Sequence, residues 1–144
     1  MSDSGLPSDP AALLALGRKL LAAQPFSVLV GASLDVFQPG HAELSLPIRD
    51  ELLQQHGGVH GGVLSYLADN AMTFAGGSVL GVNVVTAEYK INYLRQARAG
   101  MLRAVAYVES SGARLAVTRC EIAALEGDSE RTVAVAQGTI ATLT

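Results

Sequence analysis

The chain has 144 residues, with 10 Lys and Arg against 13 Asp and Glu and a formal net charge of -3. This length suits one domain with a buried core, and the sparse charge and high apolar content exclude a largely disordered chain. No dense basic run is present that would neutralise nucleic-acid phosphates, so we expect no nucleic-acid partner. The single Cys120 excludes an internal disulfide, and neither a signal peptide nor a membrane span is predicted, so we expect a cytoplasmic protein.

The first predicted element is a short helix that follows an N-terminal arm. Asp9 is a good N-cap, Pro10 suits the first helical position, and Pro25 ends the helix. We therefore expect residues 1–24 to form an arm and a short helix, and residues 25–144 to form the main domain.

A hairpin and a second helix are predicted next. Residues 27–37 and 41–47 have the composition and alternation of strands, with a turn over residues 38–40 between them. A glycine-rich approach follows, and then a helix over residues 60–75, which we expect the two following glycines to stop.

The rest of the chain alternates with the period of strands. Short turns separate the four segments, so an antiparallel meander is their simplest arrangement. The segments are residues 83–94, 101–109, 114–125 and 132–143. Because the helix is apolar nearly all round, it must be covered nearly all round. The predicted fold class is α+β, in which an antiparallel sheet of about six strands wraps one long central helix.

One carboxylate interrupts the predicted apolar helix. Asp69 is the only formally charged side chain in residues 60–75, and helical spacing places Gly61, Ser65, Asp69 and Thr73 on one row. Two interpretations follow. Asp69 either accepts hydrogen bonds from neighbouring hydroxyls or a partner chain and only stabilises the interior, or it acts on a ligand beside it.

Four glycines lie close together at the start of the same helix. They are Gly57, Gly58, Gly61 and Gly62. We expect the N–H groups of residues 61 and 62 to be unpaired at the helix start, where such donors suit the developing oxyanion of acyl transfer. The alternative is a tight turn, but four glycines in six residues exceed what a turn requires.

Other kinds of catalytic site have less support. His56 and His60 lie four residues apart, but no third ligand has suitable spacing, so no metal site is predicted. A histidine near a helix start is otherwise most often a hydrogen-bonded structural residue. No serine sits in a nucleophile elbow, and Cys120 has no nucleophile signature. Asp69 is therefore the best catalytic candidate.

Two segments, QQHGGVHGGVLSYLADNAMTFA and VTAEYKINYLRQARAG, resemble the hot-dog-fold acyl-CoA thioesterases, most closely their PaaI-like, phenylacetate-pathway branch. The resemblance covers roughly residues 25–143. It depends on the H-G-G, the acid nine residues after the histidine and the T-x-E-x-x-I-N-Y-L-R strand, in that order. It implies the hot-dog fold and hydrolysis of an acyl-CoA to free CoA and a carboxylic acid, with the CoA thioester as substrate and no cofactor.

The resemblance also implies roles for residues. Asp69 matches the family's acid, which either activates water as a general base or attacks the thioester carbonyl itself. Gly61 matches the residue whose N–H polarises that carbonyl, and His60 and Gln54 match side chains at the same oxygen. Thr73, one turn after the acid, matches the hydroxyl that holds the water.

Further residues are candidates for substrate binding. Gly62 belongs to the helix start, and Arg95 and Arg98 are candidates for the CoA phosphates, with a solvated strand end as the alternative. The resemblance implies a homodimer that pairs into a homotetramer, with each site combining Gly61 of one subunit and Asp69 of its neighbour.

Two alternative functions stay open. One is a hot-dog hydratase or dehydratase acting on acyl chains, although the spacing from the H-G-G to the acid favours hydrolysis. The other is a non-catalytic acyl-CoA-binding module, against which the lack of an added DNA-binding segment counts.

Overall fold

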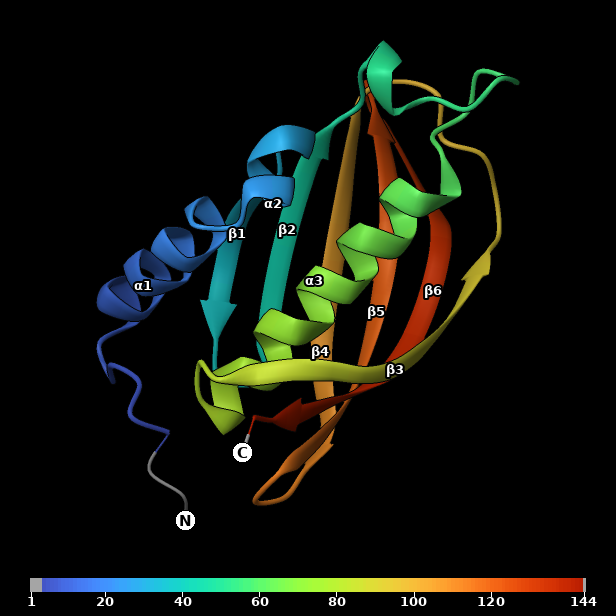
Figure 1. Ribbon diagram of the computed structural model, residues 1–144. Coiled ribbons are helices and arrows are strands. Elements are labelled where there is room, and N and C mark those ends of the chain that lie inside the picture. The colour runs from blue at the N-terminus through green and yellow to red at the C-terminus, as the bar shows by residue number, and fades with distance from the viewer. Residues whose placement is uncertain (1–3, 144) are drawn as a thin grey trace.

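The computed structural model describes residues 4–143, and its first helices lie together near one edge of the molecule (Figure 1). α1 (Pro10–Ala22) begins as predicted, because Asp9 Oδ2 accepts the N–H of Ala12 at 2.9 Å. α2 (Pro25–Val30) follows almost at once, and α1 packs on the first strand of the sheet.

Six strands form one antiparallel sheet, with α3 (Gly61–Leu80) across one of its faces (Figure 1). The strands are β1 (Ser33–Gln38), β2 (His41–Pro47), β3 (Val84–Tyr93), β4 (Met101–Ser111), β5 (Leu115–Glu126) and β6 (Ser129–Thr142). A single 3-10 turn, η1 (Asp50–Leu52), lies between β2 and α3. This architecture confirms the predicted α+β fold with one long helix packed on a six-stranded antiparallel sheet.

The hydrophobic core lies between α3 and the inner face of the sheet. Leu67, Ala71 and Met72 of α3 are fully buried, as are Leu44 of β2 and Ala104 of β4. Burial of a large apolar side chain such as Leu67 contributes about 1.5–3 kcal/mol. These contacts make α3 the element around which the rest of the domain is organised.

α3 continues past the two glycines at which the sequence predicted its end. It reaches Leu80, and Gly81 with φ of 105° ends it. A Cβ on Gly76 would lie 2.7 Å from Ile140 Cβ, so the glycine is required by the close approach of β6. Tertiary packing holds this segment helical, against the lower helix propensity of glycine.

The predicted strand over residues 27–37 is wrong in its first half. Pro25 starts α2 at the favoured first helical position, Gly31 with φ of 87° ends it, and β1 begins only at Ser33. The β-branched residues of the segment indicated a strand, but the proline and the glycine set a helix of two turns instead.

The predicted meander is wrong for β3. The spatial order of the strands is β1-β2-β4-β5-β6-β3, so β3 pairs with β6 at the far edge and not with β4. α3 carries the chain across the sheet to that edge, and residues 94–100 bring it back to β4, beside β2. In Figure 1, β3 passes across the near side of α3, so the sheet curls around the helix.

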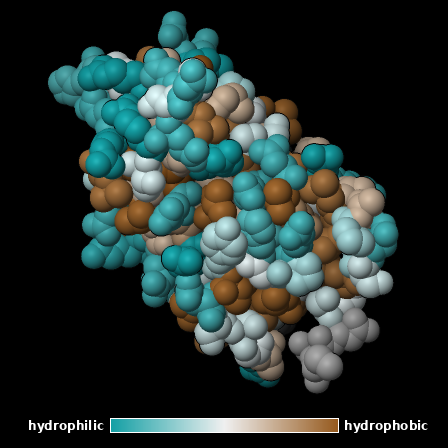
Figure 2. All heavy atoms as spheres, turned by 180° about the vertical axis from the view of Figure 1, so that it is seen from behind, coloured by the Kyte–Doolittle hydropathy of each residue, from teal (hydrophilic) through white to brown (hydrophobic). Residues whose placement is uncertain are grey.

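The outer face of the sheet has a mixed surface. Figure 2 shows hydrophilic and hydrophobic side chains interspersed over it. Arg103 of β4 donates to Glu130 of β6 at 2.5 Å, and Arg119 pairs with Glu109 across β5 and β4. Of the helices between residues 4 and 143, none combines the length and the apolar character needed to cross a bilayer.

The two glycines inside α3 allow a test of this packing. Gly76→Ala should lower the free energy of unfolding by about 1–3 kcal/mol, because its methyl group would overlap Ile140. The control is Gly77→Ala, whose Cβ would lie 3.4 Å from Val84 Cγ2, an ordinary contact. It should leave stability unchanged or raise it by up to about 1 kcal/mol through helix propensity. Equal urea midpoints for the two variants would contradict the packing.

Candidate active site

A tight loop precedes the start of α3. The Gln54 N–H donates to the Gly58 carbonyl at 2.8 Å, and the His60 N–H donates to the Leu52 carbonyl at 2.8 Å. Gly57 supplies the positive φ, 86°, that this turn requires. The loop thereby holds His60 as the residue that caps α3.

The helix start retains one unpaired donor instead of two. His60 Nδ1 accepts the N–H of Gly62 at 2.8 Å, so the expectation that this N–H is unpaired is wrong. The N–H of Gly61 donates to no acceptor among residues 4–143. His60 thus caps the helix through Nδ1 and leaves Gly61 as the available donor.

Gly61 borders an open hollow of about 360 Å³. The hollow is also lined by Gln54, Val59, Leu64, Tyr93, Leu94, Arg95 and Gln96. Tyr93 Oη donates to the Gly61 carbonyl at 3.2 Å, and a Cβ on Gly61 would lie 3.3 Å from the Tyr93 ring. A side chain at this position would therefore crowd the tyrosine and narrow the approach to the free N–H.

Polar contacts join α3 to β3 along one row. Ser65 Oγ and Tyr89 Oη share a hydrogen bond. Thr86 Oγ1 donates to Asp69 Oδ1 at 2.5 Å. Thr73 Oγ1 donates to the Asp69 carbonyl at 2.8 Å and lies 2.9 Å from Thr86 Oγ1. The helical row predicted from the sequence therefore exists, and its partners come from β3.

A β-bulge in β3 makes this row possible. The pairing of β3 with β6 shifts register between Thr86 and Glu88. In a regular strand Thr86 and Tyr89, three residues apart, would face opposite sides. The inserted residue, Ala87, turns both toward α3, where they meet residues spaced four apart on the helix.

Cover of the helix nearly all round, as predicted from the sequence, would place Asp69 inside the protein, but its side chain is half-buried between α3 and β3. Thr86 holds Oδ1, whereas Oδ2 accepts no hydrogen bond from the described part of the chain, and no Lys or Arg in that part pairs with the carboxylate. The carboxylate is thus fixed at one oxygen and has the other available for a water or a substrate. Sequence reasoning missed Thr86, whose only signal was its place in the T-x-E motif.

Gly61 and Asp69 of one chain do not converge on one point. Eight residues of helix separate them, about 12 Å along the axis, and the Ser65–Tyr89 contact lies between them. The first N–H groups of a helix also point out of its N-terminus, away from Asp69. An oxyanion donor must lie about 3 Å from the reacting oxygen. A single chain therefore does not present both groups to the same carbonyl.

The remaining predicted residues lie near the helix start. Gln54 borders the same hollow as Gly61, and its Oε1 accepts the His56 N–H at 2.5 Å. Arg95 and Arg98 are exposed on the segment between β3 and β4. Arg95 donates to a carbonyl of β6 at 3.0 Å, and Arg98 donates to the His56 carbonyl at 3.1 Å. Only Arg95 borders the hollow.

Cys120 is buried in β5 and faces the core. Burial, reinforced by the charge of Glu121, raises the pKa of its thiol to about 12. Because the thiolate is the nucleophilic form, this side chain is inert at neutral pH. The finding agrees with the prediction that Cys120 is no nucleophile.

Comparison with known proteins identifies the class. A family model described as the thioesterase superfamily matches residues 56–130, which include α3, the polar row and the strands β3, β4 and β5. The chain therefore belongs to the thioesterase superfamily. The class of activity that this membership supports is thioester hydrolysis.

Solved structures agree with this assignment. A thioesterase family protein from Silicibacter pomeroyi is 33% identical, with a TM-score of 0.84, and the match covers 88% of this chain and 94% of that one. A conserved protein from Pseudomonas aeruginosa is 37% identical, with a TM-score of 0.78 and coverage of 87% and 98%. The PaaI protein of Escherichia coli, from the phenylacetic acid degradation operon, is 25% identical, with a TM-score of 0.80 and coverage of 89% and 91%. The chain is thus a hot-dog thioesterase of the PaaI-like kind.

Proposed function

We propose that this protein hydrolyses acyl-CoA thioesters, with Asp69 as general base or nucleophile. The observation that carries the proposal is the carboxylate itself, which Thr86 holds at Oδ1 while Oδ2 accepts no hydrogen bond from residues 4–143. The PaaI-like resemblance supports a CoA thioester as the substrate and requires no cofactor.

The chemistry needs two groups at one carbonyl. The thioester oxygen accepts the Gly61 N–H, which stabilises the charge that develops on it. In one route Asp69 takes a proton from water as the water attacks the carbonyl carbon, the carbon–sulfur bond breaks, and the CoA thiolate leaves and gains that proton. In the other route Asp69 attacks the carbon, the carbon–sulfur bond breaks to release the CoA thiolate and leave an anhydride, and water then hydrolyses the anhydride and supplies the proton of the thiol. His60 and Gln54 flank the oxygen site, and Gly62 supports it through the His60 cap.

The two groups come from two chains in this proposal. β3 is an edge of the sheet, and Val85 and Tyr93 on it are 43% and 53% exposed. An exposed edge strand presents backbone N–H and C=O groups to another strand, and a second copy related by a two-fold axis is its simplest partner. If the axis passes near Ser65, halfway between Gly61 and Asp69, each Gly61 faces the partner's Asp69.

Some of the proposed features rest on the sequence alone. Thr73 as the holder of the water and pairing of two dimers into a tetramer follow from the resemblance. Arg95 and Arg98 as contacts of the CoA phosphates follow from their charge, with a solvated strand end as the alternative. A cytoplasmic location likewise stays a prediction from the sequence.

Release of free thiol from acyl-CoAs tests the proposed function. The wild-type protein should release CoA from at least one aryl- or alkyl-acyl-CoA, and Asp69→Asn should lower the rate by roughly two orders of magnitude or more. Asparagine keeps the acceptor for Thr86 but cannot take a proton. Asp35→Asn, at an exposed position of β1, is the control and should keep full activity. Binding of acyl-CoA without release of thiol would refute hydrolysis and favour the binding module, and hydration of an enoyl-CoA would favour the hydratase.

Thr86 should act through Asp69. Thr86→Val removes the hydrogen bond to Oδ1 at nearly constant volume and should lower kcat about tenfold or more with little change in KM, because the carboxylate loses its fixed orientation. Thr86→Ser keeps the hydroxyl and should retain most of the activity. Equal kcat values for the serine and valine variants would show that the contact has no part in the reaction.

Mixing of two inactive variants tests the shared site. Asp69→Asn and Gly61→Val should each be inactive alone, since one lacks the base and the other blocks the N–H. Mixed dimers combine an intact Gly61 with an intact Asp69 in one of their two sites, so refolding at equal amounts should restore about a quarter of the wild-type activity. Light scattering should show at least a dimer. Absence of recovery from two folded dimeric variants would place both groups in one chain.

A further inference from the structure

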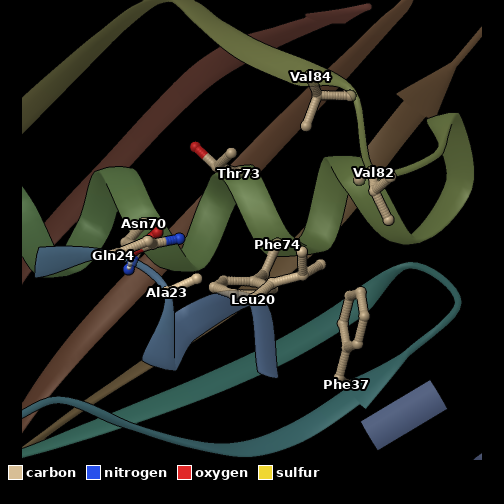
Figure 3. A pocket seen from close by; sticks show the side chains of 10 residues that line it. Leu20, Ala23, Gln24, Phe37, Asn70, Thr73, Phe74, Val82 and Val84 are labelled. Carbon is tan, nitrogen blue, oxygen red and sulfur yellow. Dashed lines mark hydrogen bonds between the residues drawn. The ribbon is translucent and has the colours of Figure 1, made fainter. Parts of the chain in front are cut away.

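A cavity of about 280 Å³ lies between α3 and the junction of α1 with α2 (Figure 3). Its apolar lining comes from four parts of the chain, with Leu20 and Ala23 from the α1 end, Phe37 from β1, Phe74 from α3, and Val82 before β3. The cavity is separate from the hollow beside Gly61, with which it shares no lining residue.

The cavity begins beside the candidate carboxylate. Thr73 lines it, and the hydroxyl of Thr73 lies 3.5 Å from Asp69 Oδ1. Figure 3 shows the Thr73 side chain between the α3 ribbon and Val84. The cavity therefore lies one turn of α3 from Asp69 and offers apolar space for the group attached to a carbonyl that reacts there.

A hydrogen-bond network fixes the cavity wall at the junction of α1 with α2. Asn70 Nδ2 of α3 donates to Gln24 Oε1 at 3.1 Å, and Ser27 Oγ donates to the same oxygen at 2.6 Å. Tyr66 Oη donates to Ser27 Oγ at 2.5 Å. The network ties the α1–α2 junction to α3, so the cavity has a defined width at this end.

Close packing of α1 on β1 fixes the position of α1 from its other side. A Cβ on Gly17 of α1 would lie 2.6 Å from atoms of Leu34 and Phe37, so α1 lies directly on β1. Arg18 Nε donates to the Leu34 carbonyl at 3.0 Å and holds the same contact. α1 cannot move outward freely to make room for a longer ligand.

We propose, on the basis of the acyl-CoA thioesterase function above, that this cavity is the acyl pocket and that α1 limits it to compact acyl groups. At about 280 Å³ the cavity lies at the lower end of the usual range for ligand pockets, about 300–1,000 Å³. This size suits a medium-length alkyl chain or a single ring better than a long fatty acyl chain. α1 lies outside residues 56–130, so the limit is set by a part of the chain beyond the matched family segment.

Kinetics on a graded panel tests the limit. We expect kcat/KM for octanoyl-CoA and phenylacetyl-CoA to exceed that for palmitoyl-CoA at least about tenfold. Leu20→Ala enlarges the cavity and should raise the lauroyl to octanoyl ratio of kcat/KM by about tenfold. Ala23→Leu narrows the cavity and should lower the octanoyl to butyryl ratio. Leu14→Ala is the matched control, since Leu14 is also half-buried on α1 but does not line the cavity.

The outcomes distinguish failure of the acyl-pocket proposal from failure of the proposed thioesterase function. Unchanged ratios in both Leu20→Ala and Ala23→Leu, or palmitoyl-CoA turned over as fast as octanoyl-CoA, would overturn the pocket and leave thioester hydrolysis intact. Failure to hydrolyse any thioester would instead overturn the proposed function. Calorimetry with non-hydrolysable alkyl-CoA thioethers then decides the pocket alone. An affinity that is highest for the octyl chain, with the maximum moved to a longer chain in Leu20→Ala, supports the acyl pocket. An affinity that does not depend on chain length refutes it.

Discussion

The burial of α3 is the constraint on which the rest of this structure depends. An apolar helix of 20 residues is stable only if nearly all its sides are covered, and the six strands curl to cover it. β6 approaches so closely that Gly76 must have no side chain. β3 lies at the edge of the sheet beside the helix, and the polar row of α3 lies where this strand passes.

The same arrangement sets the chemistry of the candidate site. Because the bulge in β3 turns Thr86 toward the helix, Asp69 is held at one oxygen without a neutralising cation. The unpaired N–H at the start of α3 lies two turns away, so the helix that presents both groups also keeps them apart. In the proposed dimer, a second copy of the chain across the free edge of β3 resolves this separation. The cavity beneath α1, which Thr73 lines one turn of α3 from Asp69, is the space that we propose for the acyl group.

Patterns that depend on near neighbours were predictable. The Asp9 cap, the apolar character of α3 and the pairing of β4, β5 and β6 in sequence order follow from spacing, propensity and short turns. The errors concern features that distant contacts decide. α2 replaced half of a predicted strand, α3 ran past its glycines because β6 packs on Gly76, and β3 joined the far edge because α3 crosses the sheet first.

The sequence by itself determined the class of fold, the family, and the positions of Asp69, Gly61 and His60 relative to the helix, because these depend on periodicity and on motifs of fixed spacing. Only the tertiary structure decided which donor at the helix start is free, that Thr86 holds the carboxylate, and that α1 closes a cavity beside it. Each of these depends on segments far apart in the chain, whose contacts are set by how the strands and helices pack and not by the spacing of residues along any one of them.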